Sequence, residues 1–359
     1  MSQRDEVCYS TRSRSPEWPV VVLALAVLRQ RDDCLTGHGC RMLLDMTTTA
    51  AGTVLITGPT GGLGRSATLA MAGRPAGERP DLLLVGRSGR GLDDVAEQAR
   101  ARGARVHAIA CDLSRLADVR AAAVTARDLV ADGTVAPLRA LVANAGFTSP
   151  DVRLASADGY ETTFAVNYLA HAQLIGDLLG SFTAPARIVL LGSNTYSANL
   201  WRRLLRVPAA RWRDPIELAR PATGETNPGT TATGVAYSDA KLAILYYAHE
   251  LQRHVASGIG VAVFEPGWMP GTGLIRDAPA VLQAIMRGVA RLPGVAGPDT
   301  SGPALASVAL DAKWANLRGG AFVLIDKVTE VRPVAHDLDR ERRLWTATAE
   351  LLAKANAPS

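Results

Sequence analysis

The sequence predicts an α/β fold: a single domain built on a doubly wound parallel sheet of about seven strands, with helices on both faces. Two observations lead to this prediction. From Thr53 onward, short runs of Val, Leu, Ile and Ala alternate with longer segments of helical pattern. The short runs are almost continuously apolar, as in strands that are covered on both faces. Such alternation of strands and helices at this spacing indicates a parallel sheet.

The elements can be placed along the chain from these runs. Strands are expected at residues 53–57, 81–86, 105–110, 139–143, 187–192, 260–265 and 321–325. Helices are expected between them at residues 91–102, 114–131, 158–179 and 238–256. The sequence shows no internal repeat and no linker within residues 50–355, so residues 46–359 are expected to form one domain.

The first 45 residues differ from the rest of the chain. They hold three of the four cysteines and one apolar run at residues 19–28, which is too short to span a bilayer. We expect residues 1–45 to be a poorly structured extension or the product of an upstream start site. A membrane-associating or partner-binding segment is the alternative.

Composition narrows the possible partners and the compartment. The chain has 359 residues, 48% of them hydrophobic, and a net charge of +5 in which basic and acidic residues are interspersed. An interspersed charge argues against a nucleic-acid partner. The four cysteines show neither pairing nor metal-ligand spacing, which favours a reducing cytoplasm. The histidines show no zinc spacing, so no metal is expected, and His249 and His254 are expected on an exposed helix face.

One connection is unusually long. It runs from Ser193 to Tyr237 and leaves the carboxyl end of an expected strand, where open α/β sheets bind ligands. We expect an insertion at about residues 195–235 that forms a substrate-side lid with a short amphipathic helix.

A glycine-rich turn follows the first expected strand. Gly58, Gly62 and Gly64 lie where a Cβ would obstruct a pyrophosphate, and the helix that follows offers its N–H groups. Pro59 and Arg65 do not fit a Walker A loop, which needs Gly and Lys there. The turn therefore predicts a dinucleotide site of the Rossmann type.

The end of the second expected strand bears on which dinucleotide binds. Gly86 and Arg87 stand where an NAD enzyme needs a carboxylate for the ribose hydroxyls. The Arg87 guanidinium suits a 2′-phosphate instead, so NADPH or NADP⁺ is the expected cofactor. A solvated surface arginine is the alternative.

A second motif supplies acid–base chemistry. Tyr237 and Lys241 are four residues apart and share one face of a helix. An ammonium beside a phenol favours the phenolate, which makes the tyrosine a usable proton donor or acceptor. Ser193 lacks the Gly-x-Ser-x-Gly context of a hydrolase nucleophile. Together the two motifs indicate a hydride-transfer enzyme.

In combination, these motifs resemble the short-chain dehydrogenase/reductase family over roughly residues 52–353. The resemblance implies a catalytic tetrad of Asn167, Ser193, Tyr237 and Lys241. It implies that the cofactor contacts come from several turns. They are Gly58, Thr60, Gly62, Leu63, Gly64, Arg87, Asp112, Leu113, Asn144, Ala145, Gly146, Tyr237, Lys241, Pro266, Gly267 and Thr272.

Within that family the chain is similar to retinol dehydrogenase-like and protochlorophyllide reductase-like members. The long insertion, the segment from Pro266 to Leu274 and the C-terminal tail carry this similarity. Light-driven reductases of that group carry a cysteine two residues after the catalytic lysine. Here the residue is Ala243, which argues against photochemistry.

The resemblance implies a mechanism and several possible functions. In carbonyl reduction, Tyr237 would donate a proton to the oxygen that Ser193 holds, while Lys241 lowers the tyrosine pKa and grips the nicotinamide ribose. Asn167 would hold a water that links Lys241 to solvent. The leading hypothesis is an NADPH-dependent reductase of a bulky apolar ketone or aldehyde. The alternatives are an NADP-linked alcohol dehydrogenase for retinoid-, steroid- or polyketide-like substrates, and a catalytically silent nucleotide sensor.

The resemblance also bears on assembly. Many relatives pair through the helices that carry Asn167 and Tyr237, so a homo-oligomer is possible unless the insertion blocks that face.

Overall fold

The computed structural model describes residues 51–197, 208–225, 229–267, 269 and 296–356. Residues 50–359 group as one compact unit, which is the unit described here. The extension expected at residues 1–45, Thr272 and the Trp- and Arg-rich part of the insertion at residues 201–206 lie outside the described residues.

The unit is organised around one eight-stranded sheet with the order β3-β2-β1-β4-β5-β6-β7-β8. All seven expected strands are present, and their pairings are parallel. An eighth strand, β8, pairs antiparallel with β7. The strands are β1 (Thr53–Thr57), β2 (Asp81–Gly86), β3 (Val106–Ala110), β4 (Leu138–Ala143), β5 (Phe182–Leu191), β6 (Ile259–Glu265), β7 (Ala321–Leu324) and β8 (Lys327–Thr329).

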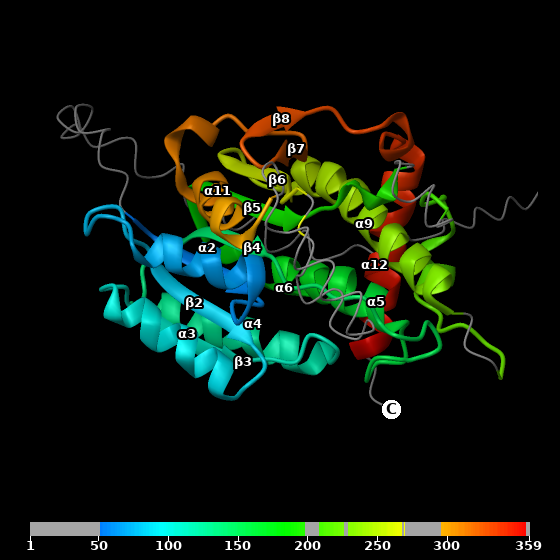
Figure 1. Cartoon of the computed structure of the whole chain (residues 1–359), viewed down its shortest axis with the longest axis horizontal. Coiled ribbons are helices and arrows are strands. Elements are labelled where there is room, and N and C mark those ends of the chain that lie inside the picture. The colour runs from blue at the N-terminus through cyan, green and yellow to red at the C-terminus, as the bar shows by residue number, and fades with distance from the viewer. Residues whose placement is uncertain (1–50, 198–207, 226–228, 268, 270–295, 357–359) are drawn as a thin grey trace, which may run out of the picture. The chain divides into compact units, whose positions relative to one another are not determined.

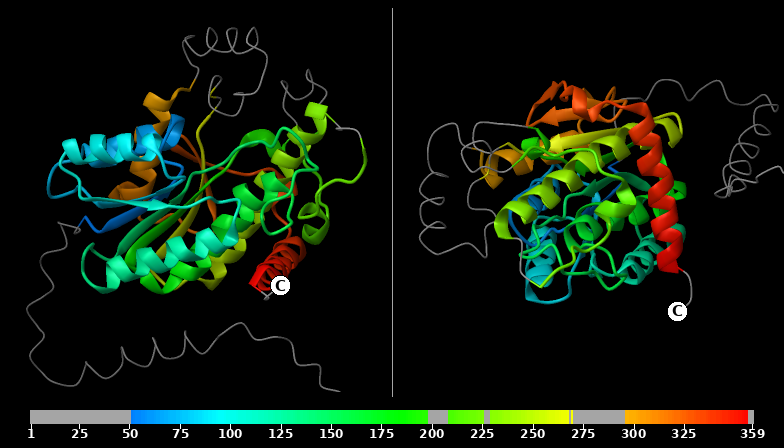
Figure 2. Two further views of the ribbon diagram at one scale, coloured as in Figure 1. Left: turned by 90° about the horizontal axis from the view of Figure 1, so that it is seen from below. Right: turned by 90° about the vertical axis from the view of Figure 1, so that its right-hand side faces the viewer.

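Helices cover both faces of this sheet (Figures 1 and 2). One face carries α2 (Gly62–Ala72), α3 (Arg90–Ala101) and α11 (Pro298–Leu310), and the other carries α4 (Leu116–Ala131), α6 (Ala170–Leu178) and α9 (Gly229–His254). The C-terminal helix α12 (Leu338–Asn356) packs beside α9.

Each face of the sheet has its own hydrophobic core. In β1, Val54 and Ile56 join the core under α2, α3 and α11, whereas Leu55 joins the core under α4, α6 and α9. This alternation follows from the two-residue period of a strand. A strand buried on both faces therefore needs apolar residues at every position, which is why the strands were recognisable as continuous apolar runs.

The strand order determines where a ligand can bind. The chain leaves β1 toward β2 on one side of it and later returns to β4 on the other side. In open α/β sheets, ligands bind at the carboxyl ends of the strands where the strand order reverses in this way. The sheet order thus places the glycine-rich turn after β1 beside the chain that leaves β4.

Two helix predictions need correction. The helix expected at residues 158–179 is divided into α5 (Thr162–Phe164), a π-helical turn at Ala165–Leu169 and α6. Helix α9 begins at Gly229, well before the expected residue 238, so the insertion expected at about residues 195–235 overlaps the start of this helix. Gly and Thr dominate residues 229–234, and their low intrinsic helix propensity concealed the helix start.

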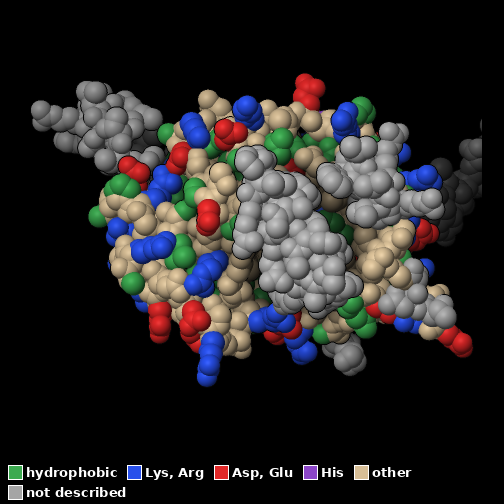
Figure 3. Space-filling view, in the orientation of Figure 1, with side chains coloured by type: hydrophobic (Ala, Val, Ile, Leu, Met, Phe, Trp, Pro, Cys, Tyr) green, Lys and Arg blue, Asp and Glu red, His purple; other side chains and the backbone are tan. Residues whose placement is uncertain are grey.

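Outside α9, the described part of the insertion contains the short helices Asn194–Tyr196 and α8 (Pro215–Leu218). No helix among the described residues combines the length and the apolar character that crossing a membrane requires. On the face shown in Figure 3, basic and acidic side chains are interspersed, in line with the sequence analysis.

Candidate active site

The turn after β1 is shaped by its glycines. Gly58 and Gly62 have φ angles of +64° and +48°, in the region that disfavours residues with a Cβ. At Gly64 the obstacle is space, because a Cβ there would lie 2.2 Å from the Gly58 carbonyl oxygen. Gly61 precedes α2 without any side-chain cap on the first N–H groups of the helix. The turn therefore presents backbone N–H groups and a positive helix end, which together suit a phosphate.

The chain leaving β4 fixes this turn through side chains. Asn144 Nδ2 donates to the carbonyl oxygens of Thr57 and Gly58, at 2.9 and 3.1 Å. The Ala145 N–H donates to Thr57 Oγ1 at 3.0 Å, and the same hydroxyl bonds to His171 Nε2 at 2.9 Å. Asn144 and Ala145 were expected to contact cofactor, and the structure shows that they also support the turn that would hold it.

His171 was missed in the sequence. It lies fully inside the protein on α6, and burial lowers its pKa to about 4, with a smaller effect from the Lys241 charge. The imidazole is therefore neutral at physiological pH and acts as a hydrogen-bonding support for Thr57. A single histidine in an apolar helix carries no sequence signal for this role.

The other expected cofactor contacts surround the same edge of the sheet. Arg87 and Thr60 are exposed, and so is Gly146 in the chain that leaves β4. Asp112 Oδ1 accepts from the Ser114 N–H and hydroxyl, at 2.9 and 2.8 Å, while Leu63 and Leu113 are buried. Gly267 has a φ of +80°, and the Ser301 hydroxyl holds the Pro266 carbonyl at 2.7 Å. Their roles toward a cofactor stay predictions.

Three of the four expected catalytic residues meet at the carboxyl ends of β5 and β6. The Ser193 hydroxyl, just after β5, lies near the phenol of Tyr237 on α9 and acts to lower the pKa of that phenol. Lys241 follows one helical turn later, with its Nζ 5.5 Å from the centre of the Tyr237 ring. The ammonium donates to the Leu191 carbonyl oxygen at 2.6 Å. Strand β5 thus positions both the hydroxyl and the lysine.

Thr195 is a further member of this group that sequence reasoning missed. Its N–H and its hydroxyl both donate to Ser193 Oγ, at 3.3 and 3.1 Å. With these donors on its oxygen, the serine hydroxyl is oriented to give its own hydrogen to a neighbouring oxygen.

Asn167, the fourth expected residue, lies in the π-helical turn. Its side-chain amide is paired with the backbone of Phe147: Oδ1 accepts from the N–H and Nδ2 donates to the carbonyl, both at 2.9 Å. A Cβ on Gly146 would lie 3.2 Å from Asn167 Oδ1 and 3.9 Å from Lys241 Nζ, which shows how close these groups are. π-Helical turns frequently occur at functional sites. A water held by Asn167 stays a prediction.

The electrostatics of the pair differ from the expectation. Burial, and then the negative charge of Glu265, raise the pKa of the Tyr237 phenol well above its usual value, and the Ser193 hydrogen bond opposes this only in part. Burial lowers the pKa of Lys241 to about 8, and Glu265 opposes that change. The phenol therefore stays protonated at neutral pH instead of being held as a phenolate.

Glu265 is the unexpected ionisable group of the site. It ends β6, is 5% exposed, and its pKa is raised to about 7, chiefly by burial. Hydrogen bonds from the backbone N–H groups of Asn194 and Gly267 and the Lys241 charge oppose this rise. In the sequence, Glu265 appeared only as the first residue of a Glu-Pro-Gly turn.

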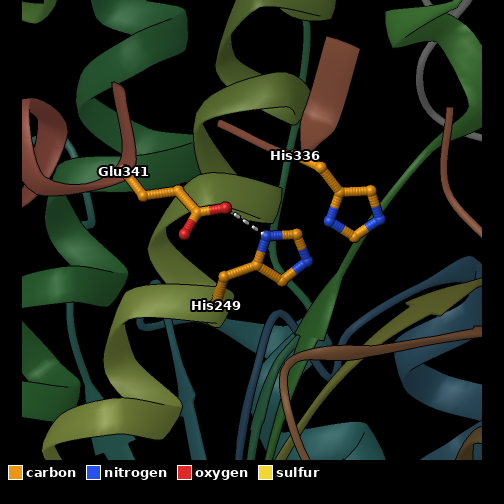
Figure 4. Close-up of side chains that lie close together, drawn as sticks. All are labelled: His249, His336 and Glu341. Carbon is orange, nitrogen blue, oxygen red and sulfur yellow. Dashed lines mark hydrogen bonds and ion pairs between the residues drawn. The ribbon is translucent and has the colours of Figure 1, made fainter. Parts of the chain in front are cut away.

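A second ionisable cluster lies between α9 and α12 (Figure 4). It contains His249, His336 and Glu341, whose ligand-type atoms lie within 4.8 Å of one another, beside a hollow of about 320 Å³. The expectation that His249 is exposed is wrong: it is 6% exposed because α12 covers it, and its Nδ1 bonds to Glu341 Oε1 at 2.8 Å.

This second cluster is better suited to ion pairing than to metal binding. Arg253 already pairs with the other Glu341 oxygen and with Glu250, which places a positive charge beside any cation. The His249 and His336 rings are parallel, at 1°, with centres 5.0 Å apart, so their in-plane lone pairs do not converge. We therefore interpret it as a network that joins α9 to α12.

Comparison with known proteins agrees with this arrangement. Residues 52–199 match the family described as short chain dehydrogenase. A short-chain dehydrogenase of Talaromyces variabilis is 26% identical over 82% of this chain and 93% of its own length. A protochlorophyllide reductase of Chlamydomonas reinhardtii is 27% identical over 84% of this chain and 77% of its own length, which confirms the resemblance to that group.

Two further matches extend the comparison. A putative daunorubicin C-13 ketoreductase of a Streptomyces species is 36% identical, over 40% of this chain and 47% of its own length. Among solved structures, an uncharacterized protein of Mycobacterium paratuberculosis superimposes with a TM-score of 0.56 and 23% identity, over 86% of this chain and 96% of that chain. The structural match confirms the fold.

Proposed function

The chain belongs to the short-chain dehydrogenase/reductase family, and we propose that it is an NADPH-dependent enzyme that reduces the carbonyl group of a bulky apolar small molecule. Membership makes it an oxidoreductase of the NAD(P)-dependent kind. The cofactor choice, the substrate class and the role of the tyrosine are the proposed parts.

One observation carries the proposal. At the carboxyl end of the sheet, the Ser193 hydroxyl lies near enough to the Tyr237 phenol to lower its pKa, and Lys241 lies one helical turn away. A carbonyl oxygen bound between the two hydroxyl groups would meet two hydrogen-bond donors. Two donors at one oxygen are what a developing alkoxide needs.

Each residue of the proposed active site has a separate role in carbonyl reduction. When bound, the nicotinamide supplies the hydride. Tyr237, whose raised pKa keeps the phenol protonated, donates its proton to the substrate oxygen. Ser193, oriented by Thr195, donates a hydrogen bond to the same oxygen. Lys241, held by the Leu191 carbonyl, provides positive charge beside the phenol.

Support for NADPH comes from the residues that follow the carboxyl end of β2. Arg87 is exposed immediately after this strand, beside the start of α3, where Arg90 is also exposed. Two guanidinium groups at this position suit a 2′-phosphate, whereas NAD recognition needs a carboxylate that the end of β2 lacks. The reductase and ketoreductase names of the relatives agree with the reductive direction.

Titration of the full chain with NADPH and, separately, NADH tests the cofactor assignment. We expect tight binding of NADPH, weaker binding of NADH, and a reversed preference in Arg87→Asp. The matched control is Arg342→Asp, which makes the same charge change at an exposed position on α12. Equal affinity for both nucleotides would mean that Arg87 is a surface arginine that does not select the cofactor. Binding of neither nucleotide would contradict the proposed function.

A further inference from the structure

Glu265 occupies a position that the chemistry above leaves unexplained. It is the last residue of β6, and the strand pairing places its neighbour Phe264 beside Leu191 of β5. Gly192 extends this pairing by donating to the Phe264 carbonyl oxygen at 2.8 Å. The glutamate side chain is thereby adjacent to the turn that carries Ser193, and the Asn194 N–H of that turn acts to lower its pKa.

The carboxyl group is incompletely paired. The side chain is buried, and Oε2 meets no hydrogen-bond partner among the residues that the structure describes. A buried carboxylate with a missing partner is costly, so such a group usually has a functional reason. If this side chain only anchored the Ser193 turn, the uncharged amide of a glutamine would do so equally well.

The groups that act electrostatically on Glu265, or on which it acts, lie on several elements. They are Tyr237 and Lys241 on α9, Tyr196 in the short helix after β5, and the backbone N–H groups of Asn194 and Gly267 in the two adjoining turns; β7, which pairs with β6 at this residue, places Leu324 opposite it. Among the described residues, Lys241 is the cation that acts on Glu265 most directly. The carboxyl group and the two α9 residues therefore form one electrostatic unit.

We propose that Glu265 is a positioning residue of this centre, which acts on the reaction through the charge that it places beside Tyr237 and Lys241. The proposal rests on the proposed function. Reduction moves negative charge onto the substrate oxygen and then, as the proton leaves Tyr237, onto the phenol. A neutral Glu265 leaves that charge unopposed, whereas an ionised Glu265 repels it. Turnover is therefore fastest when Glu265 is protonated.

The ammonium of Lys241 provides a direct readout. The chain has four lysines, and Lys313, Lys327 and Lys354 are exposed whereas Lys241 is buried. NMR of the full chain labelled with ¹³C at the lysine ε position thus gives four signals, one of which comes from the buried Lys241. Because an ionised Glu265 raises the lysine pKa, Lys241 should titrate at a lower pH in Glu265→Gln than in the wild type.

Glu217→Gln is the matched control for this titration. It makes the same chemical change at an exposed carboxylate on α8, and the Lys241 signal should stay where it is in the wild type. An unchanged Lys241 titration in Glu265→Gln would overturn the proposal. This outcome needs neither cofactor nor substrate, so it is separate from failure of the proposed function.

The pH dependence of turnover tests the effect on the reaction. With NADPH and benzil, a bulky apolar diketone used as probe, the wild-type kcat/KM should fall with rising pH in two coupled steps, because Glu265 and Lys241 both lose protons. In Glu265→Gln only one of these steps should remain. Two steps in the variant would contradict the role of Glu265, whereas no turnover of benzil or other carbonyls by the wild type would contradict the proposed function.

Discussion

At the scale of single residues, the site depends on side chains that hold one another in place. Ser193 is oriented by Thr195, Lys241 by the Leu191 carbonyl, and Thr57 by His171. The sequence identified Ser193, Tyr237 and Lys241 because their order along the chain matches a known family. It missed Thr195, His171 and Glu265, because nothing next to them in the sequence distinguishes them from ordinary turn or core residues.

Glu265 also gives a prediction for stability. Its pKa in the folded chain is raised from 4.5 to about 7, so as the pH rises from about 5 to about 7 the unfolded chain releases a proton that the folded chain retains. The wild type should lose stability over this range relative to Glu265→Gln, by at most about 3 kcal/mol. Thermal unfolding of both proteins at each pH measures this.

The control for this prediction is again Glu217→Gln, whose carboxylate is exposed. Its melting temperature should follow that of the wild type at every pH. A difference between wild type and Glu265→Gln that stays constant with pH would mean that the carboxyl group ionises as freely in the folded chain as in the unfolded chain.

At the scale of elements, the first turn of α2 packs so closely against the turn after β1 that Gly64 has no room for a side chain. We expect Gly64→Ala to abolish nucleotide binding, because its Cβ would lie 2.2 Å from the Gly58 carbonyl oxygen and 2.4 Å from Asn144 Nδ2. The overpacking should also destabilise the protein by about 1–3 kcal/mol. Isothermal titration with NADPH and chemical unfolding measure the two effects.

Gly176→Ala serves as the control for that substitution. Gly176 lies in α6, and a Cβ there meets no atom within 4 Å. This variant should bind nucleotide normally and be at least as stable as the wild type, since alanine favours a helix by about 1 kcal/mol over glycine. Normal NADPH binding by Gly64→Ala would show that the turn is not the phosphate site.

The contact between α9 and α12 is stabilised by specific hydrogen bonds and ion pairs. Glu341 is 3% exposed and bonds to both His249 and Arg253. We expect Glu341→Gln to lower the free energy of unfolding by about 1–3 kcal/mol, because it leaves buried partners unsatisfied. Glu350→Gln, at an exposed pair with Arg343, should change it by less than about 0.5 kcal/mol. Urea unfolding measures both values. Equal losses in the free energy of unfolding for the two variants would contradict this interpretation.

At the scale of the whole molecule, the sequence predicted the sheet but did not predict how the helices pack against one another. The seven parallel strands were found because strands covered on both faces are continuous apolar runs. Strand β8 is three residues long and mostly exposed, so it leaves no such run. The burial of His249 was missed because its partner Glu341 lies 92 residues away in the sequence.

The packing of α12 against α9 affects whether two chains can pair through α9. Helix α12 lies along α9, where the rings of Tyr247 and Trp345 stack at 5.5 Å and those of His254 and Trp345 at 4.5 Å. Pairing of two chains through this face of α9 would require α12 to leave it. We therefore expect sedimentation of the full chain to give a monomer. A dimer in which hydrogen exchange shows protection along this face would contradict the arrangement.

The central claim is that Tyr237 delivers the proton in an NADPH-dependent carbonyl reduction. The most direct test follows deuterium from C4-deuterated NADPH into the alcohol products of a panel of bulky apolar ketones and aldehydes, with wild type and Tyr237→Phe compared by mass spectrometry. We predict deuterated alcohol from the wild type, and a rate lower by about 10²–10⁴-fold in Tyr237→Phe with NADPH affinity preserved. Equal rates in the two proteins, or no transfer by the wild type, would contradict the account.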